Sequence, residues 1–351
     1  MKKLFVIFIF FLFSGQALAQ EGIYFIPKQD YSTSGRPIAM NVVMVDPNSN
    51  YKPELYFGSE NINSLMKLED LVRNSGAYAA INASYFKQDT GTPLGLTIVN
   101  GRMMTGPLMN RSVFGIDEDG RFHIGKVTLE GKIAIGNNDS VPIKNINQPI
   151  MTSQGAHLYN IHWGDTTPCT SNEFWHIAID KSRIVAICEC PVKIPPAGFA
   201  IVVKKSFLAY TPQYYEYVKY CYSLYPKEWC KMKCAFAAGP NLVVNGKKCV
   251  DFEEQKFTAP FANTRTARSA IGIKRDGTII LLAVDGKQKG ISEGVTLSEM
   301  ADIMLNMGAC QAMNLDGGSS TQMVVCGQLV NVPTNKIGAK VTNAVIIVKK
   351  Q

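Results

Sequence analysis

The sequence predicts an α+β fold, with mixed, twisted sheets and few helices in a single large domain. Short apolar segments separated by turn residues recur along most of its 351 residues, which is typical of a protein rich in strands. Few segments carry the spacing of an amphipathic helix. The chain shows neither an internal repeat nor a clean linker, so one domain is the simplest organisation for this length.

The strand predictions rest on apolar segments that end at turn residues. Residues 38–45 alternate between apolar and other side chains and end at Asp46-Pro47-Asn48. Arg275-Asp276-Gly277 is a hairpin-type turn between two apolar segments. The predicted strands are residues 38–45, 78–82, 269–273, 278–284, 310–315, 321–325 and 341–348.

Two segments are expected to be helices. In residues 64–75 the leucines and Val72 fall on one face, and Gly76 is placed to end the helix. In the second segment Thr296 and Glu299 form a T-x-x-E capping box, and Gly308 is placed to stop the helix.

The N-terminus predicts an exported protein. Two lysines precede an unbroken apolar run over residues 4–13, and Ala17-Leu18-Ala19 supplies an A-x-A cleavage pattern. The run is too short to cross a bilayer, and no later segment is longer and equally apolar. We therefore expect a signal peptide over residues 1–19 and a secreted or periplasmic domain over residues 20–351.

Nine cysteines follow the predicted cleavage site, and export favours disulfides among them. We expect at least two disulfides between Cys169 and Cys249, although a zinc site is an alternative interpretation. Seven tyrosines lie among lysines in residues 205–234, which we interpret as an insertion held by cystines. Those tyrosines either pack structurally or form a surface on which sugar rings stack.

The formal net charge is +8, and the basic residues are scattered along the chain. An ordinary basic surface explains this, and attraction to anionic envelope polymers or phosphorylated sugars is the alternative. No nucleic-acid-binding motif occurs, so no nucleic acid is expected as a partner. The sequence does not determine the oligomeric state.

The strongest chemical signal is the run Asn314-Leu315-Asp316-Gly317-Gly318-Ser319-Ser320-Thr321. An aspartate ends a predicted strand and enters a turn of two glycines and three hydroxyl residues. Glycines allow close approach of the backbone to a ligand, and successive N–H groups in such a turn can bind an anion. We therefore expect Asp316 to be catalytic and Gly317, Gly318 and Ser319 to bind substrate. The competing interpretation is an ordinary Asp-Gly hairpin.

Three further residues lie at the ends of predicted strands. Asp285, before Gly286, could complete the carboxyl pair that glycoside cleavage uses. Arg268 could hold a phosphate through two parallel hydrogen bonds. Asn82 could orient a sugar hydroxyl. The alternatives are a turn aspartate, a surface arginine and a strand-capping asparagine. We expect these three residues and Asp316 to converge on one cleft, because strand ends that gather on one side of a sheet can assemble a site.

Other chemistries have little support. The chain has four histidines and lacks H-E-x-x-H, G-x-S-x-G, Walker A and dinucleotide-binding motifs. We expect neither a metal nor a cofactor.

Taken in order, these segments resemble the phosphodiester glycosidases, a family that includes the enzyme that uncovers mannose 6-phosphate by removing N-acetylglucosamine. Ala83 and Ser84 stand where the family has glycines, and Ser319 where many members have a third glycine. The resemblance covers nearly all of residues 36–348. The matching segments are residues 80–86, 146–149, 157–164, 238–246, 268–272, 284–286 and 294–321.

The resemblance implies hydrolysis of a sugar joined through its anomeric carbon to phosphate, in envelope or exogenous glycans. Arg268 and the Gly317, Gly318 and Ser319 amides would then hold the phosphate, and Asp316 and Asp285 would face the sugar. Two alternatives remain: a non-catalytic glycan- or phosphate-binding protein on the same scaffold, and a glycosidase that cleaves an ordinary glycosidic bond.

Overall fold

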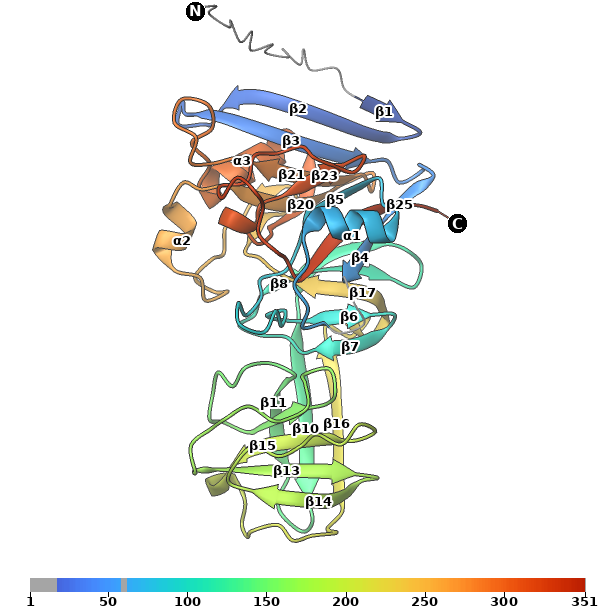
Figure 1. Cartoon of the computed structure of the whole chain (residues 1–351), viewed down its shortest axis with the longest axis vertical. Coiled ribbons are helices and arrows are strands. Elements are labelled where there is room, and N and C mark those ends of the chain that lie inside the picture. The colour runs from blue at the N-terminus through green and yellow to red at the C-terminus, as the bar shows by residue number, and fades with distance from the viewer. Residues whose placement is uncertain (1–17, 58–61, 351) are drawn as a thin grey trace, which may run out of the picture.

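A computed structural model describes residues 18–57 and 62–350, which form mostly antiparallel sheets with few helices (Figure 1). The prediction of many short strands and few helices is confirmed, whereas the α+β label fits only roughly because strands dominate. The expected signal peptide lies largely outside the described residues, and Ala19 falls in the first short strand. Within residues 18–57 and 62–350, no helix is both long and apolar enough to cross a membrane.

The largest sheet carries the site. Its eight strands follow the order β1-β2-β3-β21-β20-β22-β18-β19. The buried central strands β21 and β20 form the predicted hairpin around residues 275–277. The strands are β1 (Leu18–Gln20), β2 (Ile23–Tyr31), β3 (Pro37–Val45), β18 (Asn241–Val244), β19 (Lys247–Lys248), β20 (Arg268–Lys274), β21 (Ile279–Val284) and β22 (Ala309–Asn314).

Two five-stranded sheets pack near it. One has the order β24-β23-β5-β25-β4, and the other has the order β7-β6-β17-β8-β9. In the first, β5 pairs with β23, which brings residue 82 close to the turn after β22. The strands of the first sheet are β4 (Tyr51–Phe57), β5 (Ala79–Asn82), β23 (Met323–Val325), β24 (Gln328–Leu329) and β25 (Asn343–Lys349). Those of the second are β6 (Thr97–Val99), β7 (Arg102–Thr105), β8 (Ser112–Asp117), β9 (Phe122–Lys126) and β17 (Met232–Ala237).

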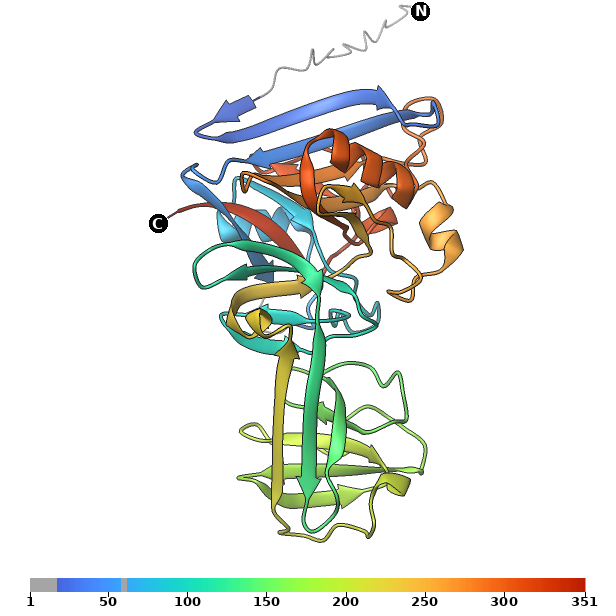
Figure 2. The ribbon, with the colours of Figure 1, turned by 180° about the vertical axis from the view of Figure 1, so that it is seen from behind.

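A seven-stranded sheet of order β14-β13-β15-β12-β11-β10-β16 builds the lower part of the molecule in Figure 1. Strands β10 and β16 pair over eight residues and form a long ribbon toward the upper part (Figure 2). Its strands are β10 (Thr128–Ile135), β11 (Val141–Ile146), β12 (Ala156–Tyr159), β13 (Phe174–Asp180), β14 (Arg183–Cys188), β15 (Phe199–Lys204) and β16 (Val218–Tyr225).

The helices are short and lie against the sheets. Helix α1 (Leu68–Ser75) starts later than expected because Met66 forms a bridge with Val341, and Gly76 ends it in the left-handed conformation, as predicted. Helix α3 (Leu297–Asn306) has the predicted capping box. Sequence reasoning missed α2 (Ala259–Asn263) and the 3₁₀ turns η1 (Lys205–Phe207), η2 (Lys227–Lys231) and η3 (Gly318–Ser320).

The segment over residues 205–234 differs from the expected cystine-held insertion. It supplies β16 to the seven-stranded sheet and the start of β17 to a five-stranded sheet. One disulfide joins Cys188 to Cys190, and the other seven cysteines are free thiols. The expectation of at least two disulfides is therefore wrong, since pairing between strands holds this segment in place.

Candidate active site

Asp316 follows the buried strand β22 and begins the turn that leads into η3. Its backbone N–H donates to Ala83 O at 3.0 Å, and its Oδ1 accepts the Gly317 N–H at 2.9 Å. Burial raises the pKa of Asp316 to about 7, while hydrogen bonds from the Ser320 side chain and the Gly317 N–H oppose that rise. Asp316 is therefore a carboxyl group that can exchange a proton near neutral pH.

Asn82 is fully buried at the end of β5 and holds the Asp316 turn in place. Its Nδ2 donates to Asp316 O at 2.7 Å, and its Oδ1 accepts from Ser269 Oγ and from Gln322 N. These bonds occupy both ends of the amide. The structure thus brings Asn82 beside Asp316 as expected, but as a support rather than as a group free to orient a sugar.

The predicted anion-binding turn uses most of its own donors. Gly317 N–H donates to the Asp316 carboxylate, and Gly318 N–H donates to Ala267 O at 2.8 Å. Gly317 has an extended backbone, whereas Gly318 has a φ of 63°, which favours glycine. Ser319 is exposed. The Gly317 and Gly318 amides therefore stabilise the turn instead of pointing to an anion.

Arg268 lies at the start of β20 and is 1% exposed. Its Nε donates to Val295 O at 2.8 Å, and its Nη2 donates to Phe261 O and Thr264 O. Burial lowers its pKa to about 10. Among the described residues Arg268 has no acidic partner within salt-bridge distance. Its guanidinium is held by backbone carbonyls and by the Phe261 ring, whose centroid lies 5.2 Å from Cζ.

Asp285 is 4% exposed and follows β21. Its Oδ1 accepts from Asn331 Nδ2 at 3.1 Å and from Val332 N at 3.0 Å, and its Oδ2 lies 3.2 Å from the same amide. Burial raises its pKa, and these hydrogen bonds oppose the rise. The carboxylate anchors the loop after β24, which differs from the expected contact with sugar.

Sequence reasoning missed an aromatic and cationic group beside Asp316. The Tyr85 hydroxyl lies within hydrogen-bond distance of Gly239 O and Leu315 O and accepts from Asn314 Nδ2. Burial raises the pKa of Tyr85, the nearby Asp316 charge raises it further, and Arg111 and Arg268 lower it. Tyr85, Asp316 and the two arginines therefore share one electrostatic environment.

Arg111 is the least expected member of this group. Its Cζ lies 3.6 Å from the centroid of the Phe257 ring and 5.4 Å from that of Tyr85. Its Nε is buried without a hydrogen-bond partner, and burial lowers its pKa. Phe257 and Phe261 stack at 4.7 Å beside it and are only half-buried. The residues around Arg111 form no motif, so the sequence did not predict this arrangement, which depends on packing.

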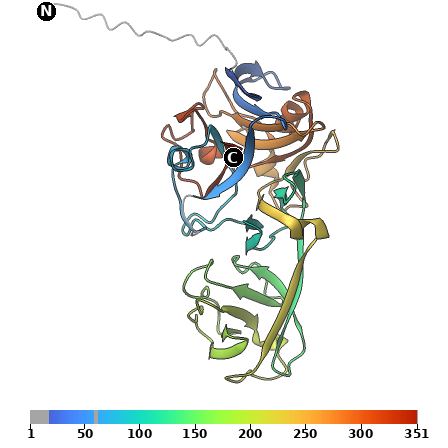
Figure 3. The ribbon, with the colours of Figure 1, turned by 90° about the vertical axis from the view of Figure 1, so that its right-hand side faces the viewer.

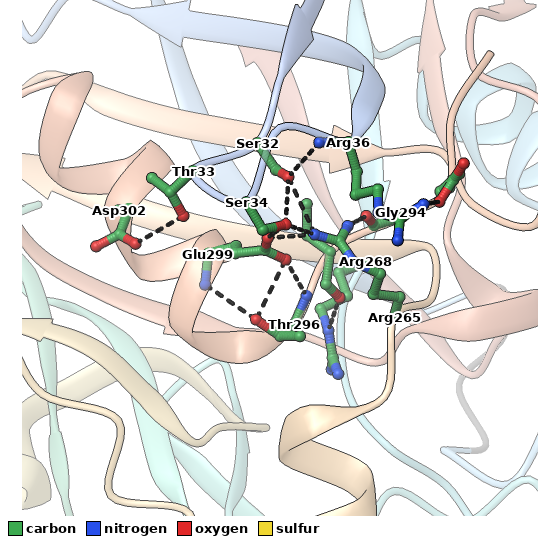
Figure 4. A network of polar contacts seen from close by, with 12 residues as sticks. Ser32, Thr33, Ser34, Arg36, Arg265, Arg268, Gly294, Thr296, Glu299 and Asp302 are labelled. Carbon is green, nitrogen blue, oxygen red and sulfur yellow. Dashed lines mark hydrogen bonds and ion pairs between the residues drawn. The ribbon is translucent and has the colours of Figure 1, made fainter. Parts of the chain in front are cut away.

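A polar network behind the site fixes the chain before Arg268. The Arg265 guanidinium pairs with Glu299 and donates to Ser32 Oγ at 3.0 Å (Figure 4). Glu299 also completes the capping box with Thr296, whose N–H donates to its Oε2 at 3.0 Å. The network therefore joins the β2–β3 turn, the start of α3 and the approach to β20 into one rigid unit.

The remaining side chains do not form a metal centre. No group of three or more His, Cys, Asp or Glu residues in the described part of the chain could hold a metal ion. The site consists of a carboxyl group, two guanidiniums and aromatic rings, which is a set suited to an anionic, ring-containing ligand.

Residues 198–348 match the family model for phosphodiester glycosidase. N-acetylglucosamine-1-phosphodiester alpha-N-acetylglucosaminidase from Bos taurus is 35% identical to this chain over 98 residues, which is 27% of this chain and 18% of the bovine protein. The matched part thus spans less than a fifth of that relative. The matched residues 198–348 include Asp285, Arg268 and Asp316, and the predicted resemblance to the phosphodiester glycosidases is confirmed over this part of the chain.

Two solved structures extend the similarity of fold to most of the chain. A hypothetical protein from Synechocystis has a TM-score of 0.83 at 25% identity, covering 93% of this chain and 62% of that one. The catalytic domain of zebrafish N-acetylglucosamine-1-phosphodiester alpha-N-acetylglucosaminidase has a TM-score of 0.52 at 16% identity, covering 93% and 82%. The fold is therefore shared beyond residues 198–348.

Proposed function

We propose that this protein hydrolyses a sugar joined through its anomeric carbon to a phosphodiester, with Asp316 as the reacting carboxyl group. The observation that carries the proposal is the arrangement around Tyr85, where the charges of the Asp316 carboxyl, with a pKa of about 7, and of the Arg111 and Arg268 guanidiniums all act on one hydroxyl. Neither arginine has an acidic partner among the described residues, and Arg111 has a buried Nε without a hydrogen-bond partner. The family of residues 198–348 supports the same reaction class.

The chemistry follows from these groups. The bond between the anomeric carbon and the phosphate oxygen breaks, and the phosphate monoester leaves with the bonding electrons. Water supplies a hydroxyl group to the sugar and gives up a proton. A phosphate ester is already a good leaving group, so neutralising its charge matters more than protonating it strongly.

Arg111 is better placed than Arg268 to contact the phosphate. The Arg268 guanidinium already donates to three backbone carbonyls, whereas Arg111 makes one weak hydrogen bond within the described residues, from Nη2 to Met109 Sδ at 3.6 Å. A phosphate oxygen would provide the acceptor that the Arg111 guanidinium lacks. The half-buried Phe257 and Phe261 rings offer flat surfaces for the sugar. Asp316, fixed by Asn82, would stabilise positive charge at the anomeric carbon or accept the proton of water.

The test compares a methyl phosphodiester of N-acetylglucosamine 1-phosphate with the corresponding 4-nitrophenyl glycoside. We expect wild-type protein to release N-acetylglucosamine from the phosphodiester, and Asp316→Asn to lower kcat at least about a hundredfold. Glu118→Gln, an exposed substitution, serves as the matched control. Turnover of the glycoside alone would favour an ordinary glycosidase, and binding without turnover of either compound would favour a non-catalytic binding protein.

We also propose that the protein is exported and acts on envelope or exogenous glycans. The charged and apolar N-terminal segment with its A-x-A pattern supports this. N-terminal sequencing of protein from the envelope or medium should find a chain that begins at or near Gln20, and an intact Met1 in cytoplasmic protein would contradict it.

A further inference from the structure

A cavity lies in the seven-stranded sheet, and none of its lining residues belongs to the candidate site around Asp316. It has a volume of about 300 Å³, and half-exposed aromatic rings line part of it. The residues that matter for binding are Asn160, Lys181, Ser182, Phe199, Tyr220 and Tyr222. Lys181 is the only charged residue in this lining.

The two tyrosines form a flat platform. Tyr220 and Tyr222 are two residues apart on β16 and therefore project from the same face of the strand. Their rings are stacked, with centroids 6.1 Å apart and an angle of 18° between the planes. The Phe199 and Tyr220 rings pack in a T-shaped arrangement with centroids 4.7 Å apart. The tyrosines are 46% and 43% exposed, so part of each side chain is open to a ligand.

The neighbouring backbone leaves room for this platform. Tyr222 pairs across the ladder with Gly131, where a Cβ would lie 2.7 Å from the Tyr222 Cβ. The other residues on this face of β16, Val218 and Leu224, are buried. Both tyrosines lie inside the β10–β16 ladder, where Tyr220 pairs with Ile133 and Tyr222 with Gly131. Figure 3 shows the long ribbon that these two strands form.

Polar groups with unused hydrogen-bonding capacity surround the rings. Asn160 uses its Oδ1 to accept from Asn147 Nδ2 and His162 N, while its Nδ2 has no partner among the described residues. The hydroxyls of Ser182, Tyr220 and Tyr222 likewise make no hydrogen bond within residues 18–57 and 62–350. Aromatic faces with such donors at their edges match the apolar ring faces and equatorial hydroxyls of sugars.

We propose that this cavity binds an internal segment of an anionic glycan, two sugar units of which stack on Tyr220 and Tyr222 while Lys181 contacts a carboxylate. The site goes beyond the proposed hydrolysis because its residues are distinct from Asp316, Arg111 and Arg268. It would hold a polymer on the protein whether or not the polymer is cleaved.

The experiment is calorimetric titration of the full exported chain with a hyaluronan hexasaccharide, and with chitohexaose as the neutral comparison. We expect Tyr220→Ala and Tyr222→Ala each to weaken binding of the hexasaccharide roughly tenfold or more, as loss of an aromatic anchor does. The matched control is Tyr214→Ala, another exposed tyrosine on the same segment but outside the cavity, which should bind like wild type. Lys181→Gln should weaken the acidic probe more than the neutral one.

Two further variants make the result decisive. Tyr222→Phe keeps the ring and should retain most of the binding, which distinguishes stacking from a folding defect. Asp316→Asn should bind the hexasaccharide like wild type even if it has lost turnover, so failure of the proposed hydrolysis does not affect this test. Absence of binding by wild type, or equal loss in Tyr214→Ala, would overturn the proposal.

Discussion

The raised pKa of Asp316 predicts that replacing this residue stabilises the protein at neutral pH. The ordinary pKa is 3.8 and the folded-state value is about 7, which corresponds to about 4 kcal/mol of differential free energy. Because Asp316 is only half-buried, solvent screening reduces this figure, and we expect about 2 kcal/mol. Asparagine retains an oxygen that can accept the Gly317 N–H but cannot ionise.

The direction of the pH dependence follows from the shift. A carboxyl whose folded pKa exceeds its unfolded pKa binds the proton more tightly in the folded chain, so its contribution to stability falls as pH rises from about 4 to about 7. The free energy of unfolding of Asp316→Asn should therefore equal that of wild type near pH 4 and exceed it by about 2 kcal/mol at pH 8.

Urea unfolding of both proteins at pH 4.5, 6, 7 and 8 measures this difference. Asp276→Asn is a control with the opposite sign, because hydrogen bonds from Thr278 lower the pKa of the exposed Asp276 carboxyl. A difference between Asp316→Asn and wild type that stays constant from pH 4.5 to 8 would refute the reasoning, as would a variant less stable than wild type at pH 8.

Four other outcomes are expected. In the wild type, kcat/KM for the phosphodiester should show an inflection near pH 7, seen in a pH–rate profile and absent if Asp316 does not react. Arg111→Gln should raise KM for the phosphodiester at least about tenfold without lowering the urea midpoint, since the guanidinium has no acidic partner among the described residues to lose. Asp285→Ala should lower the free energy of unfolding by about 1–3 kcal/mol, because the Val332 N–H loses its acceptor, and equal urea midpoints would contradict that anchoring role. Thr296→Ala should cost about 1 kcal/mol by removing the N-cap of α3, whereas unchanged thermal unfolding would show that the capping box adds nothing.

Local features of the fold could be predicted from the sequence, and long-range pairing could not. The capping box at Thr296 and the glycine after α1 depend on residues within one turn, so their pattern is visible in the sequence. The role of residues 205–234 depends on eight pairs with β10, almost a hundred residues earlier in the chain. Because the pairing with β10 is not visible in the sequence, the tyrosines and cysteines of this segment suggested an insertion.

The places of several candidate site residues in the fold could be predicted from the sequence, whereas the contacts that their side chains make could not. Asp316, Asn82 and Arg268 do lie at the ends of strands that meet, as the apolar segments indicated. Arg268 nevertheless donates hydrogen bonds to the carbonyls of residues 261, 264 and 295. These contacts depend on the tertiary structure and cannot be predicted from the sequence. Arg111 carried no sequence signal because what distinguishes it is the absence of an acidic partner among the described residues.

The two Asp-Gly turns show why one local pattern produces two kinds of carboxyl group. Both Asp285 and Asp316 follow buried strands, and burial raises the pKa of each. The Asp285 carboxylate accepts hydrogen bonds from the Asn331 side chain and the Val332 amide, which lie in a loop more than forty residues later in the chain. These donors stabilise its negative charge. The Asp316 carboxylate accepts hydrogen bonds from the adjacent Gly317 amide and the nearby Ser320 side chain. Its backbone N–H donates to Ala83 O, and its backbone carbonyl accepts from Asn82 Nδ2. The origin of the donors, rather than the Asp-Gly pattern, therefore separates a structural anchor from a group poised to exchange a proton.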